Sequence, residues 1–380
     1  MGTPDVAIIT PYPSTGRLPS GVAAYSASLT RALREAGAEV AVVAPADDDP
    51  SKPARGEPGI LRPFRRGPSA LPVAARAAHA TGAPAVHLQH ETFLYGGPSA
   101  LPGLVGALAS LRGAGRRAVV TMHHVVDPAE VDADFTRSHR VRVPAPVARA
   151  GLAAVQHTVG RLASDVIVHE PRFGRVVPRA RIVPHGVESV ETADRGAAQE
   201  RLGVDDGRLV VLCFGFLAPY KGLETALAAS ALAGDHVHLV IAGGEHPRLA
   251  EEYGERLREL APAGTTFTGY VPDEDVADWF AAADVALLPY PRPFASSGPL
   301  ALALAHGTPV LMSEALARTT GAPGALAVSA DPAAIAGRLG TLAADGGERE
   351  RLRAAARGLS TGRTWPEIAR RHLALYGRPA

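Results

Sequence analysis

Short runs of apolar residues recur along the chain, and polar or glycine-containing segments separate them. Within each run the apolar residues are consecutive rather than alternating, which is typical of strands buried on both faces of a parallel sheet. The strands predicted in this way are Val6–Ile9, Val40–Val43, Ala85–Gln89, Ala118–Met122, Val166–Val168, Leu209–Phe214, Val237–Ala242 and Val285–Pro289.

Several of the intervening segments carry apolar residues at helical spacing. Because strand and helix alternate, the pattern indicates βαβ units and an α/β fold with doubly wound parallel sheets. The predicted helices are Val22–Glu35, Glu224–Leu232, Leu249–Leu260 and Leu300–His306, followed by an amphipathic helix within Thr361–Tyr376.

The strand–helix series occurs twice, as expected for 380 residues at roughly 100–200 residues per domain. The first series ends near Ile182–Val187, and the second starts at Leu209. The polar segment Glu188–Gly207 between them predicts a linker and a capped helix. The predicted parts are two doubly wound domains, 1–187 and 188–360, and a docked amphipathic helix in 361–380.

Composition narrows the possible partners and compartments. The 39 basic residues nearly balance the 38 acidic ones, which argues against a protein that coats nucleic acid. The single cysteine, Cys213, cannot form an internal disulfide, and no Cys/His spacing resembles a zinc site. Neither a secretory signal nor a run of about 20 apolar residues is present. We therefore expect a soluble cytoplasmic protein with no nucleic-acid partner.

Two loops of the second half carry groups suited to an anion. Ligands of open α/β sheets bind beyond the carboxyl ends of the strands, where helix N-termini present free N–H groups. The loop Gly215–Gly222 follows a predicted strand and places Lys221 just before a helix. The segment Ser296–Gly298 stands at the start of another helix. Together they predict a phosphate site, with a surface lysine and a plain helix cap as the structural alternatives.

Polar residues also follow predicted strands of the first half. Gly21 opens the first helix, where a ligand can approach the backbone closely. Several histidines and one glutamate lie just beyond strands or in the hinge loop, which predicts a polar cleft at one sheet edge. These residues are His90, Glu91, His123, His124, His169 and His185.

Two polar segments interrupt the alternation, Asp47–Pro68 with Arg62–Arg66 and Asp127–Pro146 with three arginines (Arg137, Arg140 and Arg142). Solvated surface loops explain both segments more simply than mobile loops over a cleft. Asp132-Ala-Asp134 has the letters of a metal-binding motif, but it lies in a polar loop rather than after a strand. No metal site is predicted there.

A series of short motifs resembles the retaining glycosyltransferases of family 4, which have the GT-B fold. Each motif is weak, whereas their order and spacing are specific and span nearly the whole chain. The resemblance implies two Rossmann-like domains facing a central cleft, the first for the acceptor and the second for a nucleotide-sugar. It also implies that the C-terminal helix in 361–380 crosses back to the first domain. The motifs are Gly21–Tyr25, Gln89–Gly97, Val120–His123, Pro184–Val187, Phe214–Gly222, Thr268–Pro272 and His306–Pro309.

The resemblance also implies roles for individual residues. Lys221 would bind the donor diphosphate, and His123 would contact the transferred sugar near the reaction centre. The residues implied for the donor diphosphate and sugar are Gly21, Gly215, Lys221, Ser296, Ser297, Gly298 and Pro299. Those implied for the nucleobase are Gly269, Tyr270 and Val271, and candidate acceptor-cleft residues are His90, Glu91, His124 and His185.

The chain departs from the family pattern at two places. Two glutamates eight residues apart are common in the family, but these positions hold Phe294 and Leu302. The chain instead resembles a branch with a Ser-Ser-Gly donor loop, and the group that holds the ribose is unassigned. Phe216 and Ala218 occupy positions where an arginine is usual, which leaves Lys221 as the one clear cation.

The implied activity is transfer of a sugar from a nucleotide-diphosphate donor to a hydroxyl acceptor with retention, without a cofactor or metal. The acceptor is expected to be a small molecule or natural-product scaffold, because Arg62–Arg66 is only a thin membrane-docking signal. A lipid-linked acceptor and a catalytically degenerate GT-B binding protein are the alternatives.

Two other enzyme classes fit less well. A Rossmann dehydrogenase needs a G-x-G-x-x-G motif after a strand and an acidic residue about 20 positions later, and the chain lacks this pattern. A retaining glycosidase needs two carboxylates that flank the sugar. Glu91 and Glu170 are the candidates, but they follow different strands.

Overall fold

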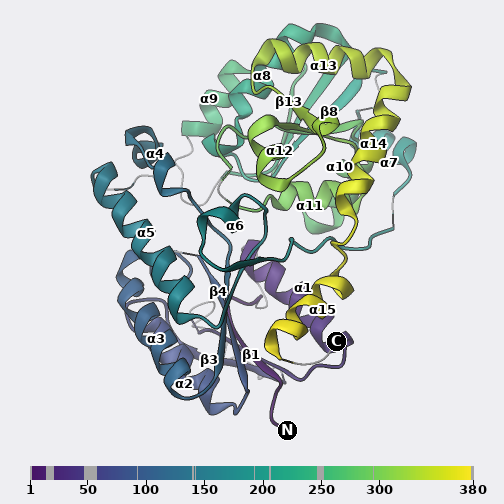
Figure 1. Ribbon diagram of the computed structural model, residues 1–380. Helices are drawn as coiled ribbons and strands as arrows, with labels where there is room; N and C mark the ends of the chain where they lie inside the picture. The colour runs from purple at the N-terminus through teal and green to yellow at the C-terminus, as the bar shows by residue number, and fades with distance from the viewer. Residues whose placement is uncertain are drawn as a thin grey trace. The chain divides into compact units, whose positions relative to one another are not determined.

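Two units, each built around one parallel sheet, make up the described part of the chain (Figure 1). Contacts between residues assign Met1–Gly186, Phe294–Ser296 and Gly362–Ala380 to unit 1, and Val187–Pro293 and Ser297–Thr361 to unit 2. The computed structural model describes residues 2–13, 21–46, 58–91, 93–138, 141, 143–191, 193–204, 207–245, 252–293 and 295–377.

The sheet of unit 1 is parallel throughout its described strands, in the order β3-β2-β1-β4-β5-β6-β7. The strand order reverses between β1 and β4, which makes their carboxyl ends a topological switch point. The strands are β1 (Val6–Ile9), β2 (Val40–Pro45), β3 (Ile60–Phe64), β4 (Ala85–His90), β5 (Arg117–Met122), β6 (Asp165–Val168) and β7 (Ala180–Ile182).

Helices cover both faces of this sheet because its strands are apolar on both sides. Ala7 and Ile9 of β1 pack in a cluster with residues of α2 and α3, whereas Val6 and Ile8 pack with residues of α1 and α15. The helices and 3-10 turns of unit 1 are α1 (Gly21–Glu35), α2 (Ala70–Ala80), η1 (Gly97–Ala100), α3 (Leu101–Gly113), η2 (Pro128–Glu130), α4 (Ala133–Ser138), α5 (Ala145–Leu162), α6 (Phe173–Val176) and α15 (Trp365–Tyr376).

The C-terminal helix α15 lies beside α1 in unit 1, as Figure 1 shows. Its buried face carries Trp365, Ile368 and Leu373, which share a core cluster with Tyr25 and Leu29 of α1. The near-helical spacing of apolar residues in the tail predicts this amphipathic helix, and the prediction is confirmed.

Gly186 allows Trp365 to pack closely. A Cβ atom at residue 186 would lie 2.5 Å from the Trp365 ring. We therefore expect Gly186→Ala to displace the indole and lower the free energy of unfolding by about 1–3 kcal/mol, measured by urea titration. The control is Gly106→Ala on α3, where no described atom lies within 4 Å of the added Cβ. This variant should gain up to about 1 kcal/mol, and equal losses in both variants would contradict the account.

Unit 2 has a second parallel sheet, in the order β10-β9-β8-β11-β12-β13 within the described residues. The order reverses between β8 and β11, so the switch point lies at the carboxyl ends of these two strands. The strands are β8 (Leu209–Phe214), β9 (Val237–Ala242), β10 (Thr266–Gly269), β11 (Val285–Leu288), β12 (Val310–Ser313) and β13 (Ala327–Val328).

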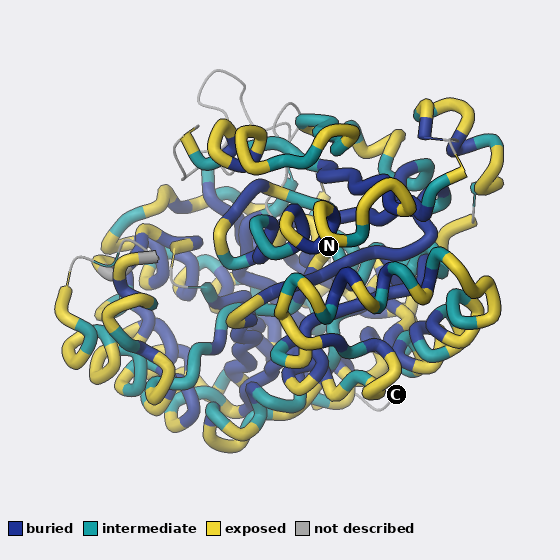
Figure 2. The backbone as a smooth tube through the Cα atoms, turned by 90° about the horizontal axis from the view of Figure 1, so that it is seen from above, coloured by how far each residue is buried: buried dark blue, intermediate teal, exposed yellow. Residues whose placement is uncertain are grey.

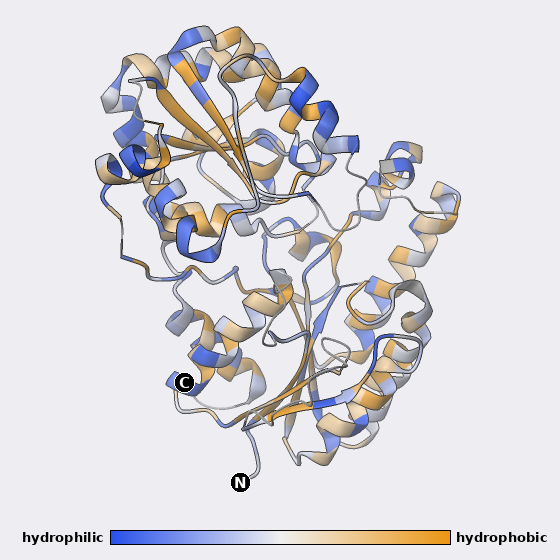
Figure 3. Ribbon diagram, turned by 180° about the vertical axis from the view of Figure 1, so that it is seen from behind, coloured by the Kyte–Doolittle hydropathy of each residue, from blue (hydrophilic) through white to orange (hydrophobic). Residues whose placement is uncertain are grey.

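A single large apolar cluster joins this sheet to its helices. Figure 2 shows buried strands with exposed outer helix surfaces, and Figure 3 shows the strands as predominantly hydrophobic. The helices and 3-10 turns of unit 2 are α7 (Arg195–Leu202), η3 (Pro219–Lys221), α8 (Leu223–Ala233), η4 (Gly234–His236), α9 (Glu252–Leu260), η5 (Asp273–Asp275), α10 (Val276–Ala282), α11 (Gly298–Ala305), α12 (Glu314–Thr320), η6 (Gly324–Leu326), α13 (Pro332–Ala344) and α14 (Gly346–Ser360).

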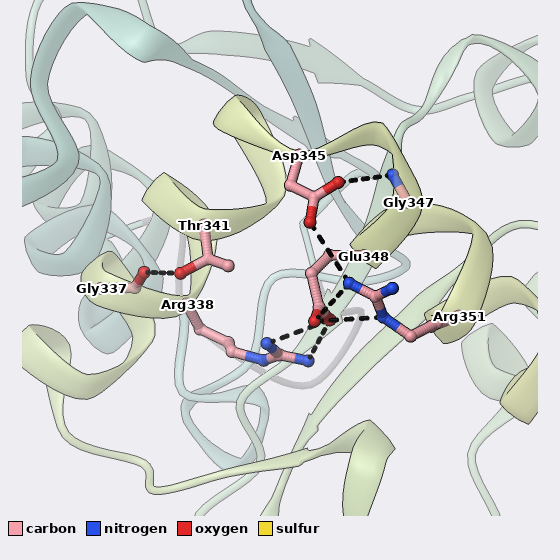
Figure 4. Close-up of polar contacts among 7 residues, drawn as sticks. All are labelled: Gly337, Arg338, Thr341, Asp345, Gly347, Glu348 and Arg351. Carbon is pink, nitrogen blue, oxygen red and sulfur yellow. Dashed lines mark hydrogen bonds and ion pairs between the residues drawn. The ribbon is translucent and has the colours of Figure 1, made fainter.

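Polar contacts fix the turn between α13 and α14 (Figure 4). Asp345 caps α14 by accepting a hydrogen bond from the Gly347 backbone N–H at 2.7 Å. Glu348 pairs with Arg338 from α13 and with Arg351 one turn further along α14. Because these charges are partly exposed, each pair contributes only about 0–1 kcal/mol, and the network mainly fixes the direction of the chain.

The eight predicted strands are all present, with ends shifted by at most two residues, so the α/β fold class is confirmed. The predicted linker helix is also confirmed as α7, with Asp194 as its N-cap. The helix predicted at Leu249–Leu260 is described from Glu252 onward, and residues 246–251 lie outside the described chain. The described residues include no helix long and apolar enough to span a membrane.

The two segments expected to be loops are partly structured, so these predictions were wrong. Ile60–Phe64, inside the Asp47–Pro68 segment, forms edge strand β3, while residues 47–57 lie outside the described chain. The second segment, Asp127–Pro146, contains η2, α4 and the start of α5. Arg137 pairs with Asp134 there, and Arg140 and Arg142 lie outside the described residues.

Candidate active site

The two loops predicted to bind phosphate meet at the switch point of unit 2. They follow β8 and β11, which pair in parallel, so their carboxyl ends share one sheet edge. A Cβ atom at Gly222 would lie 2.3 Å from the Pro289 carbonyl oxygen, and one at Gly215 would lie 3.4 Å from Pro299. The Gly215–Gly222 loop therefore packs directly against the loop that carries Ser297, Gly298 and Pro299.

Lys221 places a buried ammonium group in this site. It ends the 3-10 turn η3, is 5% exposed, and donates a hydrogen bond from Nζ to the Phe214 carbonyl oxygen at 2.9 Å. No carboxylate of the described chain forms an ion pair with it. Burial lowers the pKa of Lys221 to about 8. A buried cation without a counter-ion is costly, so the site is prepared for an anion.

Gly215 is required by this lysine. Its φ of +99° favours glycine, and a Cβ atom would lie 2.4 Å from Lys221 Nζ. The space expected to admit the diphosphate at Gly215 is thus filled by the ammonium group itself. Gly215 therefore leaves space for the Lys221 ammonium group.

The two adjacent serines have different surroundings. Ser297 is the N-cap of α11, where its hydroxyl accepts from the Leu300 N–H at 3.1 Å and donates to the Tyr290 hydroxyl at 3.2 Å. Ser296 belongs to unit 1, and its buried hydroxyl has no hydrogen-bond partner within the described residues. The cap therefore accounts for Ser297 but not for Ser296.

The segment predicted to lie along a nucleobase follows β10. Gly269 has a φ of +67°, Val271 is buried, and the Tyr270 side chain is half exposed. A Cβ atom at Gly244 would lie 3.6 Å from Tyr270, so this segment contacts the loop after β9, the neighbour of β8. Its role toward a nucleobase stays a prediction.

Histidines of unit 1 gather around Tyr25 of α1. The rings of His123, His169 and His185 each lie 5.0 Å from the Tyr25 ring, centroid to centroid. His123 follows β5 and His169 follows β6. His185 is the last residue but one of the first segment of unit 1, which ends at Gly186. Tyr25 was part of a quoted motif but had no predicted role, and it is the residue that brings these three rings together.

A chain of hydrogen bonds fixes the orientation of His123. Because the Val183 carbonyl only accepts, His169 must donate to it from Nδ1, at 2.9 Å. His169 Nε2 lies 3.3 Å from His123 Nδ1. His123 Nε2 donates to the Gln89 side-chain oxygen at 2.8 Å, because an amide oxygen only accepts. Both nitrogens of His123 are thus used within unit 1.

Other histidines of unit 1 are also buried. His87 contacts the Tyr376 hydroxyl at 2.6 Å and the Thr121 hydroxyl at 2.7 Å. Burial lowers the pKa of His169 to about 3 and those of His90 and His372 to about 4. Burial, with neighbouring histidines, also holds the pKa values of His87 and His123 well below their usual range. These rings are therefore neutral at physiological pH.

The remaining predicted acceptor-cleft residues also lie in unit 1. His90 is buried, and its Nδ1 has no hydrogen-bond partner among the described residues. Glu91 and His124 approach to 3.6 Å, and His185 Nδ1 donates to the Gly186 carbonyl at 2.7 Å. Gly21 begins α1, and no described atom lies within 4 Å of its Cβ position. The structure brings His123 and His185 together, and it places Glu91 beside His124.

The Asp132-Ala-Asp134 motif is used locally. Asp132 accepts a hydrogen bond from the Phe135 N–H at 2.7 Å, and Asp134 pairs with Arg137. Across the described ranges, no three His, Cys, Asp or Glu side chains gather as potential metal ligands. Independence from metal stays a prediction, because it concerns the reaction rather than this arrangement.

Comparison with known proteins identifies the family. Residues 208–345 match the family model described as glycosyl transferases group 1. A D-inositol 3-phosphate glycosyltransferase of Xylanimonas cellulosilytica is 30% identical over 286 residues, which cover 64% of this chain and 67% of that protein. A phosphatidyl-myo-inositol mannosyltransferase of Mycobacterium leprae is 27% identical and covers 98% of this chain and 96% of its own length.

A solved structure gives the same architecture. The Anabaena HepE structure in complex with UDP superposes with a TM-score of 0.71 at 15% identity, covering 98% of this chain and 99% of that one. Together with the two parallel sheets, these matches confirm the GT-B fold class of two Rossmann-like domains. The chain belongs to the group 1 glycosyltransferases.

Proposed function

We propose that this glycosyltransferase moves a sugar from a nucleoside-diphosphate donor to a hydroxyl of a small-molecule acceptor, with retention of configuration and without a metal. Unit 2 takes the donor, and unit 1 takes the acceptor. The observation that carries the proposal is Lys221, a buried ammonium at the β8–β11 switch point that pairs with no carboxylate of the described residues. A diphosphate supplies the negative charge that this group lacks.

The donor we propose is a uridine diphosphate sugar. The similar HepE structure was solved with UDP, which supports this choice of base for a chain of the same fold. Lys221 neutralises the diphosphate, and the backbone N–H of Gly298 at the N-terminus of α11 donates to it. Gly269, Tyr270 and Val271 line the base through their backbone.

The proposed step needs no protein nucleophile. The bond between the anomeric carbon and the β-phosphate oxygen breaks, and the acceptor oxygen forms its bond to this carbon on the same face. The acceptor proton passes to the departing phosphate oxygen, so atoms and charge balance. Lys221 stabilises the charge that develops on the diphosphate, which is an electrostatic contribution in a water-poor site.

A small polyol is the acceptor we favour. The Xylanimonas relative is named for D-inositol 3-phosphate, whereas the Mycobacterium relative is named for phosphatidyl-myo-inositol. A soluble ring compound is consistent with the polar groups of unit 1, where His90 ends β4 and Glu91 follows it. A phosphatidylinositol acceptor is the alternative, and it is distinguished by assaying both.

A thermal-shift panel tests the donor. We expect UDP and a UDP-sugar to stabilise the protein by about 2.7 kcal/mol at 100 times their dissociation constants, and GDP, ADP and dTDP to stabilise it less. Turnover is then measured as UDP release, first with myo-inositol 3-phosphate and then with phosphatidylinositol vesicles. Release without EDTA sensitivity supports metal independence.

Each result decides between the candidate functions. Stabilisation by UDP with acceptor-dependent release of UDP supports the transferase. Stabilisation by UDP without turnover on any acceptor supports the alternative of a degenerate binding protein. No stabilisation by any of the four nucleotides would contradict the placement of the donor site at Lys221.

A further inference from the structure

Unit 1 contains buried polar atoms that have no hydrogen-bond partner among the described residues. Glu170, in the turn after β6, is 2% exposed, and its Oε2 has no hydrogen-bond partner among the described residues. The same is true of the buried Ser296 hydroxyl. Arg363, which precedes α15, is 8% exposed and forms no ion pair with a carboxylate of the described chain. All three residues belong to unit 1.

Ser296 and Arg363 lie near Glu170, and no hydrogen bond within 3.5 Å joins Glu170 Oε2 to the Ser296 hydroxyl. Burial raises the pKa of Glu170 to about 7, while the charge of Arg363 and the Ser296 hydroxyl act in the opposite direction. Arg363 also acts on His169, the residue next to Glu170. Nevertheless, no ion pair within 4.0 Å joins Glu170 and Arg363. An acid, a hydroxyl and a guanidinium group therefore lie close together, and neither Glu170 Oε2 nor the Ser296 hydroxyl has a hydrogen-bond partner among the described residues.

The chemistry of the three groups selects a ligand class. Buried polar groups in proteins almost always find partners, so two unpartnered ones beside Arg363 indicate a bound molecule. A hydroxyl group both donates and accepts, so neighbouring hydroxyls can accept from Arg363 and donate to Glu170. A phosphate oxygen only accepts, and an ionised Glu170 would repel it. Neighbouring hydroxyls of a sugar or cyclitol ring satisfy all three groups.

We propose that Glu170, Ser296 and Arg363 form a hydroxyl-binding subsite that holds vicinal hydroxyls of a substrate ring. The proposal rests on the transferase function above and specifies one part of its substrate recognition. The ring belongs either to the donor sugar or to the acceptor, because both present the same chemistry. Glu170 is a binding residue in this account, and it takes no covalent part in the reaction.

Two variants and a control test the subsite. Glu170→Gln keeps the shape of the side chain, and Glu170→Ala removes its polar atoms. Glu39→Ala is the control, since Glu39 is an exposed glutamate of the same unit. Without ligand at pH 8, Glu170→Gln should melt at the wild-type temperature or above it, because an unpartnered buried carboxylate is removed. A melting temperature lower by about 4 °C or more would show a structural role and overturn the proposal.

Calorimetric titrations then locate the ring. The first arm compares UDP-glucose with UDP, and the second titrates myo-inositol and myo-inositol 3-phosphate into the UDP complex. Glu170→Ala should leave the dissociation constant of UDP within twofold of wild type. In one of the two arms it should weaken binding of the ring compound at least tenfold. A loss in the first arm assigns the subsite to the donor sugar, and a loss in the second assigns it to the acceptor. Glu39→Ala should change neither.

The outcomes separate this proposal from the proposed function. If wild type binds UDP but Glu170→Ala alters neither arm, the subsite is wrong while the transferase function stands. If wild type does not bind UDP, the proposed function fails, and the subsite, which rests on it, fails with it. Arg363→Ala should weaken the same arm as Glu170→Ala, and weakening of the opposite arm would contradict a shared ligand.

Discussion

Replacing Lys221 with methionine should make the protein more stable and weaken its binding of UDP. Burial holds the pKa of the ammonium at about 8, which is about 3 kcal/mol of destabilisation at pH 7 relative to a free lysine. Methionine fills similar space without charge, and loss of the hydrogen bond to the Phe214 carbonyl costs about 1 kcal/mol. The net gain expected from urea titration at pH 7 is about 2 kcal/mol.

The dependence of this gain on pH gives a second readout. Because the native pKa of Lys221 is lowered, the unfolded chain binds more protons between about pH 8 and 10.5, and wild type gains stability as the pH rises through this window. Lys221→Met lacks this rise, so its advantage should disappear by about pH 10.5.

The functional cost of the same substitution should be large. A charged hydrogen bond to phosphate is worth about 1.5–3 kcal/mol, so UDP should bind Lys221→Met at least about tenfold more weakly. Gly215→Ala provides the matched test, because its Cβ would occupy the position of the ammonium and leave the lysine in the sequence. Unchanged UDP binding in both variants would show that the anion site lies elsewhere.

Unit 1 should unfold in mild acid, before unit 2. Five buried histidines of unit 1 have lowered pKa values, and they are His87, His90, His123, His169 and His372. In the unfolded chain they titrate near pH 6.5, so each stabilises the fold above this pH and loses that contribution as the pH falls toward its native value. Glu170 offsets one of them, because its raised pKa favours the native state between about pH 7 and 4.5.

Unfolding then takes up about four protons, so the free energy of unfolding falls by about 5 kcal/mol per pH unit below pH 6.5. Since domains are stable by about 5–15 kcal/mol, unit 1 should be unfolded near pH 5. The chain has two tryptophans, Trp365 in unit 1 and Trp279 in unit 2, which report the units separately. Fluorescence of Trp279→Phe should show the acid transition at higher pH than that of Trp365→Phe. Transitions at the same pH would contradict the histidine account.

The apolar runs predicted the fold because the central strands are buried on both faces, and such strands need long apolar stretches. Of the five strands that the pattern missed, β3, β7 and β10 are partly exposed and β13 is very short, whereas β12 is fully buried. β3, with the sequence Ile-Leu-Arg-Pro-Phe, alternates between intermediate and exposed positions at the sheet edge, and β13 has only two residues. Their pairing depends on a neighbouring strand rather than on local sequence.

The candidate site was predictable from the sequence where its functional residues lie in one loop. Lys221 and Gly215 are six positions apart, and their loop was identified from the strand that precedes it. The different surroundings of Ser296 and Ser297 were not predictable, since the two residues are identical in type and adjacent. Arg363 and Glu170 are distant in sequence, and only the packing of the chain end into unit 1 brings them together.

The buried amine also gives the protein an intrinsic chemical label. Only two of its 39 basic residues are lysines, Lys52 and Lys221, and the others are arginines that stay protonated. An amine with a pKa of about 8 is substantially neutral, and hence nucleophilic, under conditions where an ordinary lysine is not. Amine-directed reagents therefore have few targets in this chain, and one of them lies at the proposed donor site, where occupancy by a ligand translates into protection from modification.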